Sequence, residues 1–334
     1  MLHFEDFPEG LSLPLDRHHF DAESIIRFAE QFDPQPFHLD AHSPAAKQLG
    51  GLIASGWHTC SALMRMMCDA YLLNTASQGS AGLDEVRWLK PVFAGDTLTG
   101  TATVDSRRVL NSRPNMGVVN FTYLMNNQKG EPVLRMRGMG FVAVRNPGKL
   151  KPGPKPTGPK PAESIKSTPE DAKPSPRTGS FYDRLVPGIV RDLGSHTFER
   201  DPIITFANQF DTQRFHLSDE GAKGSHFDRL CASGWHTAAQ WMRQNVENSY
   251  HGLQDAIGYD GPPVAFGPSP GFRNLRWYLP VYAGDTIHYR TTLTGKRIQA
   301  HRPGWGLLTN HAEGFNQHGE RVISMDGAVT VPTG

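Results

Sequence analysis

The chain contains the same segment twice. Residues 31–39, Gln-Phe-Asp-Pro-Gln-Pro-Phe-His-Leu, return 178 positions later at 209–217 as Gln-Phe-Asp-Thr-Gln-Arg-Phe-His-Leu, with seven of nine positions identical. At the same offset, residues 52–59 return at 230–237 with seven of eight identical, whereas none of the twelve aligned pairs between these blocks is identical. Two similar folding units are therefore expected. Because the two copies have diverged so unequally, the matching blocks are expected to hold a functional site.

The repeat divides the 334 residues into two halves of similar size, 1–150 and 181–334. Each half is large enough to bury a core of its own. Residues 151–180 contain eight prolines, five lysines and a single large aliphatic residue, Ile165. Such a composition cannot bury enough apolar surface to fold, so this segment is predicted to be a flexible linker. A docking site for an acidic partner is the alternative interpretation of its Lys-Pro pattern.

Charge and composition exclude several classes of protein. A net charge of +1 and a pI near 7.8 give no overall field to attract nucleic acid or an anionic membrane. The three cysteines, Cys60, Cys68 and Cys231, show neither disulfide nor metal-ligand spacing, which is typical of buried thiols in a reducing compartment. We find no secretory signal and no apolar run of membrane-spanning length, so a cytoplasmic location is expected.

Hydrophobic spacing predicts the same two helices in each half. In the first half, Ile25, Phe28, Ala29 and Phe32 form an amphipathic stripe behind Asp21, a candidate N-cap. In the second half the corresponding helix is expected to begin at Asp201-Pro202, as a cap followed by a proline in the first turn. A second helix, apolar on more than one face and therefore buried, is predicted to start near 55–56 and again near 233–234.

The remainder of each half predicts antiparallel strands. Residues 87–97 match 276–286 as a strand block, and alternating β-formers follow. Asn-Gln-Lys-Gly at 127–130 and Asn-Gln-His-Gly at 316–319 are typical hairpin turns. The offset here is 189, so the second half has gained 11 residues, which we assign to a proline-rich loop at 261–271. One buried helix followed by a long antiparallel sheet predicts an α+β fold in each half.

The matching blocks contain residues suited to proton transfer. Asp33 and His38 are separated by an irregular, proline-containing path that can bring a carboxylate and an imidazole together around one water molecule. Eighteen residues after His38, Gly56 lies at the predicted start of the buried helix, where its N–H could stabilise a developing negative charge. The second half repeats both spacings with Asp211, His216 and Gly234.

These motifs resemble the MaoC-like acyl dehydratases, which include the (R)-specific enoyl-CoA hydratases. The resemblance rests on Asp-x-Gln-Pro-x-His, then Ala-Ser-Gly at the start of a helix, then Lys-Pro-Val-Phe-Ala-Gly-Asp-Thr. It covers nearly the whole of each half, although the hydratases usually carry Asn where Gln35 stands. It implies two hot-dog domains in tandem, each a long antiparallel sheet wrapped around a central helix. The two halves would then pair as a pseudo-dimer, and further homo-oligomerisation stays open.

The resemblance also implies a reaction, the reversible hydration of a trans-2-enoyl thioester to an (R)-3-hydroxyacyl thioester. Asp33 and His38 would bind the water, His38 would take its proton, and Gly56 would donate its N–H to the thioester oxygen. The same roles fall on the second set, Asp211, His216 and Gly234. The residues flanking the glycines, Ser55, Trp57, Ser233 and Trp235, are expected to contact the acyl-CoA substrate. No cofactor and no metal are expected.

Two departures from the family pattern affect this interpretation. Many members carry a serine eight residues beyond the glycine, where this chain has Met64 and Met242. In the second half Arg214 replaces the motif proline, so the first site is expected to be the main one. The alternatives are a hot-dog thioesterase and a non-catalytic acyl-thioester-binding protein. Acyl chain length, pathway and the choice between CoA and a carrier-protein thioester stay open.

Four further residues allow two interpretations each. His58 and His236 follow the glycines and could line the pocket or even bind a metal, but packing with one hydrogen bond is favoured. Arg113 and Arg302 could meet the phosphates of coenzyme A, although solvation at the surface is the favoured interpretation.

Overall fold

The computed structural model describes residues 1–150, 178–262 and 264–334. The predicted linker at 151–180 therefore lies almost entirely outside the described residues. The first half contains η1 (Phe4–Asp6), β1 (Ser12–His19), α1 (Ala22–Phe32), α2 (Pro36–Leu39), α3 (Pro44–Leu49), α4 (Gly56–Ala70), η2 (Leu72–Asn74), β2 (Gly82–Trp88), β3 (Thr97–Val109), β4 (Met116–Asn126) and β5 (Pro132–Ala143). The second half contains α5 (Phe181–Arg184), β6 (Val190–Thr197), α6 (Arg200–Phe210), η4 (Arg214–His216), α7 (Asp219–Ala222), α8 (Gly234–Ile257), β7 (Gly271–Trp277), β8 (Thr286–Ile298), β9 (Trp305–Phe315) and β10 (Arg321–Pro332).

The strands of both halves form one continuous antiparallel sheet of ten strands, in the order β1-β3-β4-β5-β2-β7-β10-β9-β8-β6. The halves join where β2 pairs with β7. Gly82 and Gly271 lie at this junction with φ of 145° and 130°, and a Cβ at either would lie 2.0 Å from a carbonyl oxygen of the opposite strand. Glycine therefore permits the close approach of the two halves at both positions.

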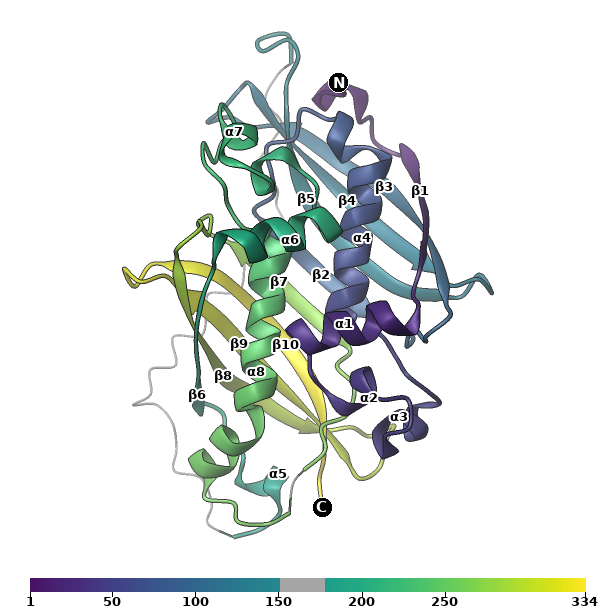
Figure 1. Cartoon of the computed structure of the whole chain (residues 1–334), viewed down its shortest axis with the longest axis vertical. Helices are drawn as coiled ribbons and strands as arrows, with labels where there is room; N and C mark the ends of the chain where they lie inside the picture. The colour runs from purple at the N-terminus through teal and green to yellow at the C-terminus, as the bar shows by residue number, and fades with distance from the viewer. Residues whose placement is uncertain (151–177, 263) are drawn as a thin grey trace.

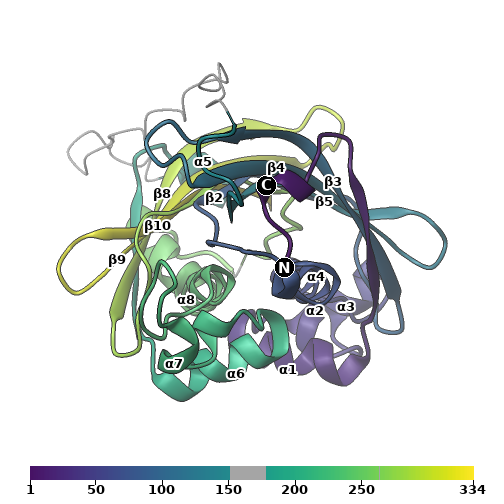
Figure 2. The ribbon, with the colours of Figure 1, turned by 90° about the horizontal axis from the view of Figure 1, so that it is seen from above.

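The helices cover the concave face of this sheet. Figure 2 shows α4 and α8 side by side beneath the curved sheet, with α1 and α6 below them on the side away from the strands. The predicted stripe of α1 is buried in the core, and Asp21 caps the helix by accepting a hydrogen bond from the Ser24 N–H. A long antiparallel sheet wrapped around a central helix, present twice, confirms the predicted α+β architecture of two hot-dog units (Figure 1). The domain boundaries at 150 and 181 stay a prediction.

The structure corrects three details of the expected elements. Helix α6 is capped by Glu199 rather than Asp201, which lies inside the first turn; Pro202 is tolerated there because N–H groups of a first turn have no helical acceptor. The block 87–97 is the end of β2, a turn and the first residue of β3, not one strand. Helix α8 has 24 residues against 15 in α4, so most of the length gained by the second half extends this helix.

Other local expectations are confirmed. Both Asn-Gln-x-Gly segments connect hairpins, β4–β5 and β9–β10, and their glycines have φ of 76°. All three cysteines are buried and free. In the part of the chain that the structure describes, no helix is long and apolar enough to cross a bilayer.

Candidate active site

Asp33 and His38 converge, as their spacing predicted. Asp33 is the C-cap of α1, and its carbonyl accepts a hydrogen bond from the Gln35 N–H at 2.7 Å, which turns the chain immediately. Pro36 then starts the single turn of α2, which carries His38. The His38 Nε2 lies 3.4 Å from the Asp33 Oδ2, and the two residues are only 4% and 2% exposed. The carboxylate and the imidazole thus share one small space.

The backbone fixes which ring nitrogen of His38 is basic. Its Nδ1 lies 2.8 Å from the carbonyl oxygen of Ile53. Because a carbonyl oxygen can only accept a hydrogen bond, the Nδ1 must carry the proton. In the neutral ring, the lone pair is therefore on the Nε2, the atom that faces Asp33. This arrangement lets His38 accept a proton from a molecule held beside the carboxylate.

Asp33 is held by two neighbours whose roles the sequence did not reveal. The Ser55 hydroxyl donates to its Oδ2 at 2.6 Å, and the Gln35 Nε2 donates to its Oδ1 at 2.8 Å. Ser55 also caps α4, since its oxygen accepts a hydrogen bond from the Trp57 N–H at 3.1 Å. Ser55 was expected to contact substrate, but it is 0% exposed and its hydroxyl is bonded to Asp33. The geometry gives it a positioning role. The glutamine is identical in both repeat blocks, as Gln35 and Gln213, and this identity is the sequence signal that could have marked Gln35 as part of the site.

Gly56 is the first residue of α4, where backbone N–H groups have no acceptor one turn earlier. A steric constraint also requires glycine at position 56. A Cβ here would lie 2.3 Å from the Trp88 ring, and the Trp88 Nε1 donates to the Gly56 carbonyl oxygen at 3.1 Å. The tryptophan therefore occupies the space where a side chain would be, and only glycine fits.

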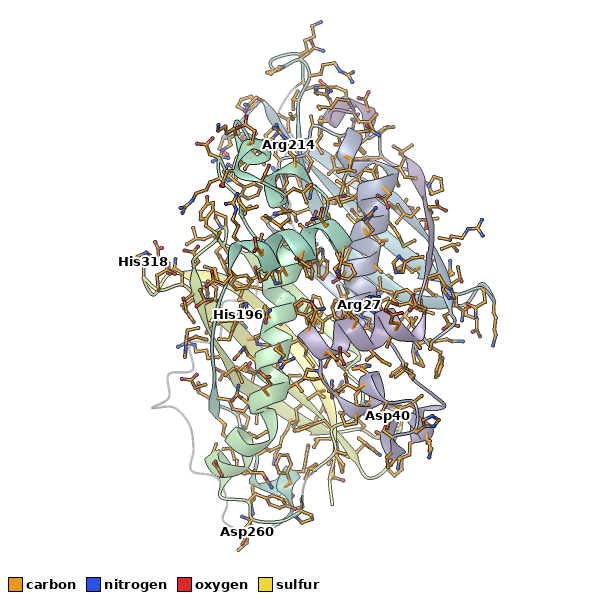
Figure 3. All side chains as sticks on the ribbon, viewed as in Figure 1. Arg27, Asp40, His196, Arg214, Asp260 and His318 are labelled. Carbon is orange, nitrogen blue, oxygen red and sulfur yellow. The ribbon has the colours of Figure 1, made fainter. Side chains whose placement is uncertain are left out.

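The second site reproduces this geometry. The His216 Nε2 lies 3.4 Å from the Asp211 Oδ2, and the His216 Nδ1 lies 2.8 Å from the Cys231 carbonyl oxygen. Ser233 and Gln213 donate to Asp211 at 2.6 and 3.0 Å. Replacement of the motif proline changes the turn from α2 to the 3-10 helix η4, yet His216 has the same place as its counterpart. Arg214 itself is exposed on this turn (Figure 3).

Each site opens into a cavity whose far wall belongs to the other half. Cavity 1, of about 700 Å³, is bordered by Asp33, His38 and Gly56 and by parts of α8, β8, β9 and β10. Cavity 2, of about 520 Å³, is bordered by Asp211, His216 and Gly234 and by parts of α4, β4 and β5. Neither half encloses its own site, so pairing of the halves within one chain is needed to complete both.

The other predicted contacts divide between the cavities and the core. Trp57 lines cavity 1, whereas Ser233 and Trp235 line cavity 2. The two methionines at the family's serine position line the opposite cavities, Met64 in cavity 2 and Met242 in cavity 1. No hydroxyl stands at either of these positions.

His58 and His236 lie in the core, as the packing interpretation expected. Each ring stacks on a phenylalanine of the amphipathic helix of its own half, Phe28 of α1 at 4.6 Å and Phe206 of α6 at 4.7 Å. Burial lowers the pKa of both imidazoles to about 3, so they are neutral at physiological pH. The expected hydrogen bond is not made at either Nδ1, which has no partner among the described atoms.

Arg113 is exposed, as the solvation interpretation expected, and Arg302 is half-buried; both also border a cavity. Arg302 lines cavity 1 and lies over the Trp305 ring at 3.9 Å. Arg113 lines cavity 2.

Comparison with known proteins agrees with this architecture. Residues 11–122 match the model of the MaoC like domain. The mesaconyl-CoA hydratase of Cereibacter sphaeroides is 41% identical over 115 residues, which are 34% of this chain and 32% of that protein. The uncharacterized protein YdeM of Bacillus subtilis is 25% identical over 149 residues, 45% of this chain and 96% of that protein.

Two solved structures share the fold over the whole length. A putative MaoC domain dehydratase of Chloroflexus aurantiacus superposes with a TM-score of 0.77 at 20% identity, covering 100% of this chain and 98% of that one. A conserved hypothetical protein of Mycobacterium tuberculosis, described as a double hot-dog fold, gives 0.71 at 13% identity, covering 99% and 98%. At such identities the likeness concerns the fold alone.

Proposed function

Because the chain is a MaoC-like protein of the tandem hot-dog form, we propose that it is a hydratase that adds water reversibly to a trans-2-enoyl thioester. The observation that supports this most is the pairing of the His38 Nε2 with the Asp33 Oδ2 at 3.4 Å, beside the first N–H of α4 and at the end of a cavity. An acyl-CoA is the proposed substrate, and the product is the (R)-3-hydroxyacyl thioester.

In the proposed reaction, a water molecule in the cavity bridges Asp33 and His38 from the side, with hydrogen bonds to both. The His38 Nε2 takes one proton from it while the oxygen forms a bond to C3 of the enoyl group. The π electrons shift towards the thioester, whose oxygen accepts the Gly56 N–H as negative charge develops. Asp33 orients the water and relays the proton taken up by His38 to C2, so that both residues return to their starting state, one water is consumed and no other group is released.

The magnitudes suit this division of labour. A positioned acid/base pair typically contributes about 10²–10⁴-fold to the rate, and a single oxyanion donor about 3–4 kcal/mol. The hydrogen bonds from Ser55 and Gln35 support the proposal, because they hold the carboxylate in place beside His38.

Loss of enoyl absorbance on adding crotonyl-CoA tests the reaction, and a series of chain lengths extends the test. Release of free thiol would instead indicate the thioesterase. Absence of both signals at every chain length would favour the non-catalytic binding protein.

A pair of variants tests the ranking of the two sites. Asp33→Asn is expected to cost more activity than Asp211→Asn, because cavity 1 is the larger and its turn keeps the motif proline. The exposed Asp40→Asn, seven residues from Asp33 (Figure 3), is the matched control and should leave activity unchanged. Equal losses from the first two variants, or a larger loss from the second, would refute the ranking.

A further inference from the structure

Cavity 1 contains a half-buried cation on the wall that the second half supplies. Arg191 lies on β6 and lines this cavity. Its Nη2 donates to the Asn245 Oδ1 of α8 at 2.8 Å, so the side chain extends under the sheet towards the central helix. Burial lowers the pKa of this guanidinium to about 10, which still leaves it charged at neutral pH.

Arg191 forms a polar arc in the wall of cavity 1 together with Asn245, Thr291 and Asn310. Arg191 pairs with Thr291 in the sheet, and Asn310 pairs with Leu293, two residues further along β8. Paired residues of antiparallel strands lie on one face, so these side chains surround the same part of the cavity. Asn310 has a buried Oδ1 with no hydrogen-bond partner among the described atoms. An amide can turn either its oxygen or its NH₂ towards a ligand, so Asn310 offers a donor to an anion.

Cavity 2 shows that the fold does not require this polarity. The positions equivalent to the polar arc, at the offsets of 178 and 189 residues, are apolar in the first half. Arg191, Asn245, Thr291 and Asn310 correspond there to Leu13, Met67, Ala102 and Phe121, of which Met67 and Phe121 line cavity 2. The same fold therefore has apolar residues at these positions in the first half and a cationic, hydrogen-bonding set of residues at the equivalent positions of the second half.

The charge of the whole cavity points to the same kind of ligand. Asp33 is the one acidic residue among the described residues that line cavity 1, and it is engaged with His38, Ser55 and Gln35. The basic residues of the lining are Lys90, Arg191, Arg297 and Arg302, of which Lys90 is paired with Glu131 at 2.7 Å. The loop between α8 and β7 also borders this space, through residues 266–270. A cavity with this balance favours an anion over an uncharged alkyl chain.

We propose that the acyl group taken by cavity 1 ends in a carboxylate, which Arg191 binds together with Asn310. This inference rests on the proposed hydratase function and narrows its substrate to enoyl thioesters of dicarboxylic acids. A guanidinium fork matches a carboxylate in two parallel hydrogen bonds, which fixes the far end of the acyl chain. Anchoring that end orients the double bond over Asp33 and His38.

The test uses matched pairs of substrates with the full-length protein. Each pair consists of a trans-2-enoyl-CoA and its counterpart of equal carbon number with a terminal carboxylate, from four to eight carbons. For at least one length the wild type should hydrate the carboxylated substrate with a kcat/KM about tenfold higher or more. Hydration of the uncharged series with no preference at any length would overturn the inference and leave the proposed hydratase standing. Hydration of neither series would instead remove the proposed function itself.

Variants at Arg191 identify the group responsible. Arg191→Leu, which copies Leu13 of the first half, should lower kcat/KM for the preferred carboxylated substrate about 100-fold, mostly through KM, and change the uncharged partner less than about threefold. For the carboxylated substrate, the kcat/KM of Arg191→Lys should lie between those of the wild type and of Arg191→Leu, because the charge remains and the guanidinium fork is lost. The exposed Arg17→Leu on β1 is the control and should change neither substrate. An equal loss on both substrates would overturn the proposal, because Arg191 would then bind the coenzyme A phosphates or support the fold.

Discussion

The contact between Gly56 and Trp88 makes a prediction that separates the steric and the chemical role of this glycine. In Gly56→Ala, the new Cβ would lie 2.3 Å from the ring, whereas carbon atoms normally approach to about 3.5–4.0 Å. The ring cannot move aside freely, because its Nε1 is bonded to the Gly56 carbonyl oxygen and its faces pack near Trp57 and Phe272. We expect a cost of about 3 kcal/mol for overpacking and about 1 kcal/mol for the weakened hydrogen bond.

A second substitution should relieve the clash. Trp88→Leu alone should cost about 3 kcal/mol through the lost ring. If the effects were independent, the double variant would lose about 7 kcal/mol, but without the ring the methyl group of alanine fits. Because Trp88→Leu alone already removes both the ring and its hydrogen bond, the double variant should lose only about 3 kcal/mol, a coupling of about 4 kcal/mol. Because alanine keeps its N–H, the double variant should also recover hydratase activity relative to Gly56→Ala.

Equilibrium urea unfolding of the four proteins measures this coupling, and crotonyl-CoA hydration follows the activity. Gly252→Ala in α8 is the control, since a Cβ there meets nothing within 4 Å and should stabilise the helix by about 0.5–1 kcal/mol. An uncoupled pair, or a harmless Gly56→Ala, would refute the steric explanation. Recovered stability without recovered activity would show that the position of the N–H, not packing alone, requires glycine.

Three further predictions follow from the burial and bonding of single side chains. The hydrogen bond to Asp326, with a further contribution from Glu313, raises the pKa of His311 to about 9. The stabilisation that protonated His311 gives the fold is complete below the ordinary pKa near 6.5 and is lost as pH rises through about 9. His311→Asn should therefore cost about 2 kcal/mol at pH 6 and much less at pH 10, and a pH-independent cost in urea unfolding would contradict this. Ser55→Ala should lower kcat about tenfold and stability by about 1–3 kcal/mol, whereas Ser55→Thr keeps the oxygen and most of both; a fully active alanine variant would exclude a positioning role. Burial raises the pKa of all three thiols, that of Cys231 to about 12, so Ellman's reagent should react rapidly only after denaturation, and rapid reaction of the native protein would contradict the burial.

The repeat was informative because it compares two solutions to one structural problem within a single chain. The spacing of Asp33, His38 and Gly56, and its repetition, predicted three groups that the structure brings to the end of one cavity. Local rules sufficed for this, since a helix end, a proline turn and a helix start are short-range features. The cap of α6 was misplaced because Asp201-Pro202 satisfies the local rule at a position that the chain uses for the first turn.

Some site residues were visible in the repeat blocks but not interpretable there. Gln35 and Ser55 are repeated as Gln213 and Ser233, yet their function depends on which atom each side chain reaches. A hydroxyl 22 residues from a carboxylate in sequence becomes its hydrogen-bond donor only when α4 packs against the end of α1. Trp88 lies in the matching strand block and is repeated as Trp277, yet the repeat does not show that its ring contacts Gly56.

The sequence by itself determined the two-unit plan and the α+β pattern, and it picked out the residues proposed here as acid/base groups, because each depends on periodicity and spacing along the chain. Only the tertiary structure decided that each pair faces a cavity walled by the opposite half, and that Arg191 lines cavity 1 whereas its counterpart in the repeat, Leu13, does not line cavity 2. The physical reason is that a cavity exists between surfaces. Its shape and charge arise where β2 meets β7 and the helices pack, and contacts between residues so far apart leave no periodic signal in the sequence.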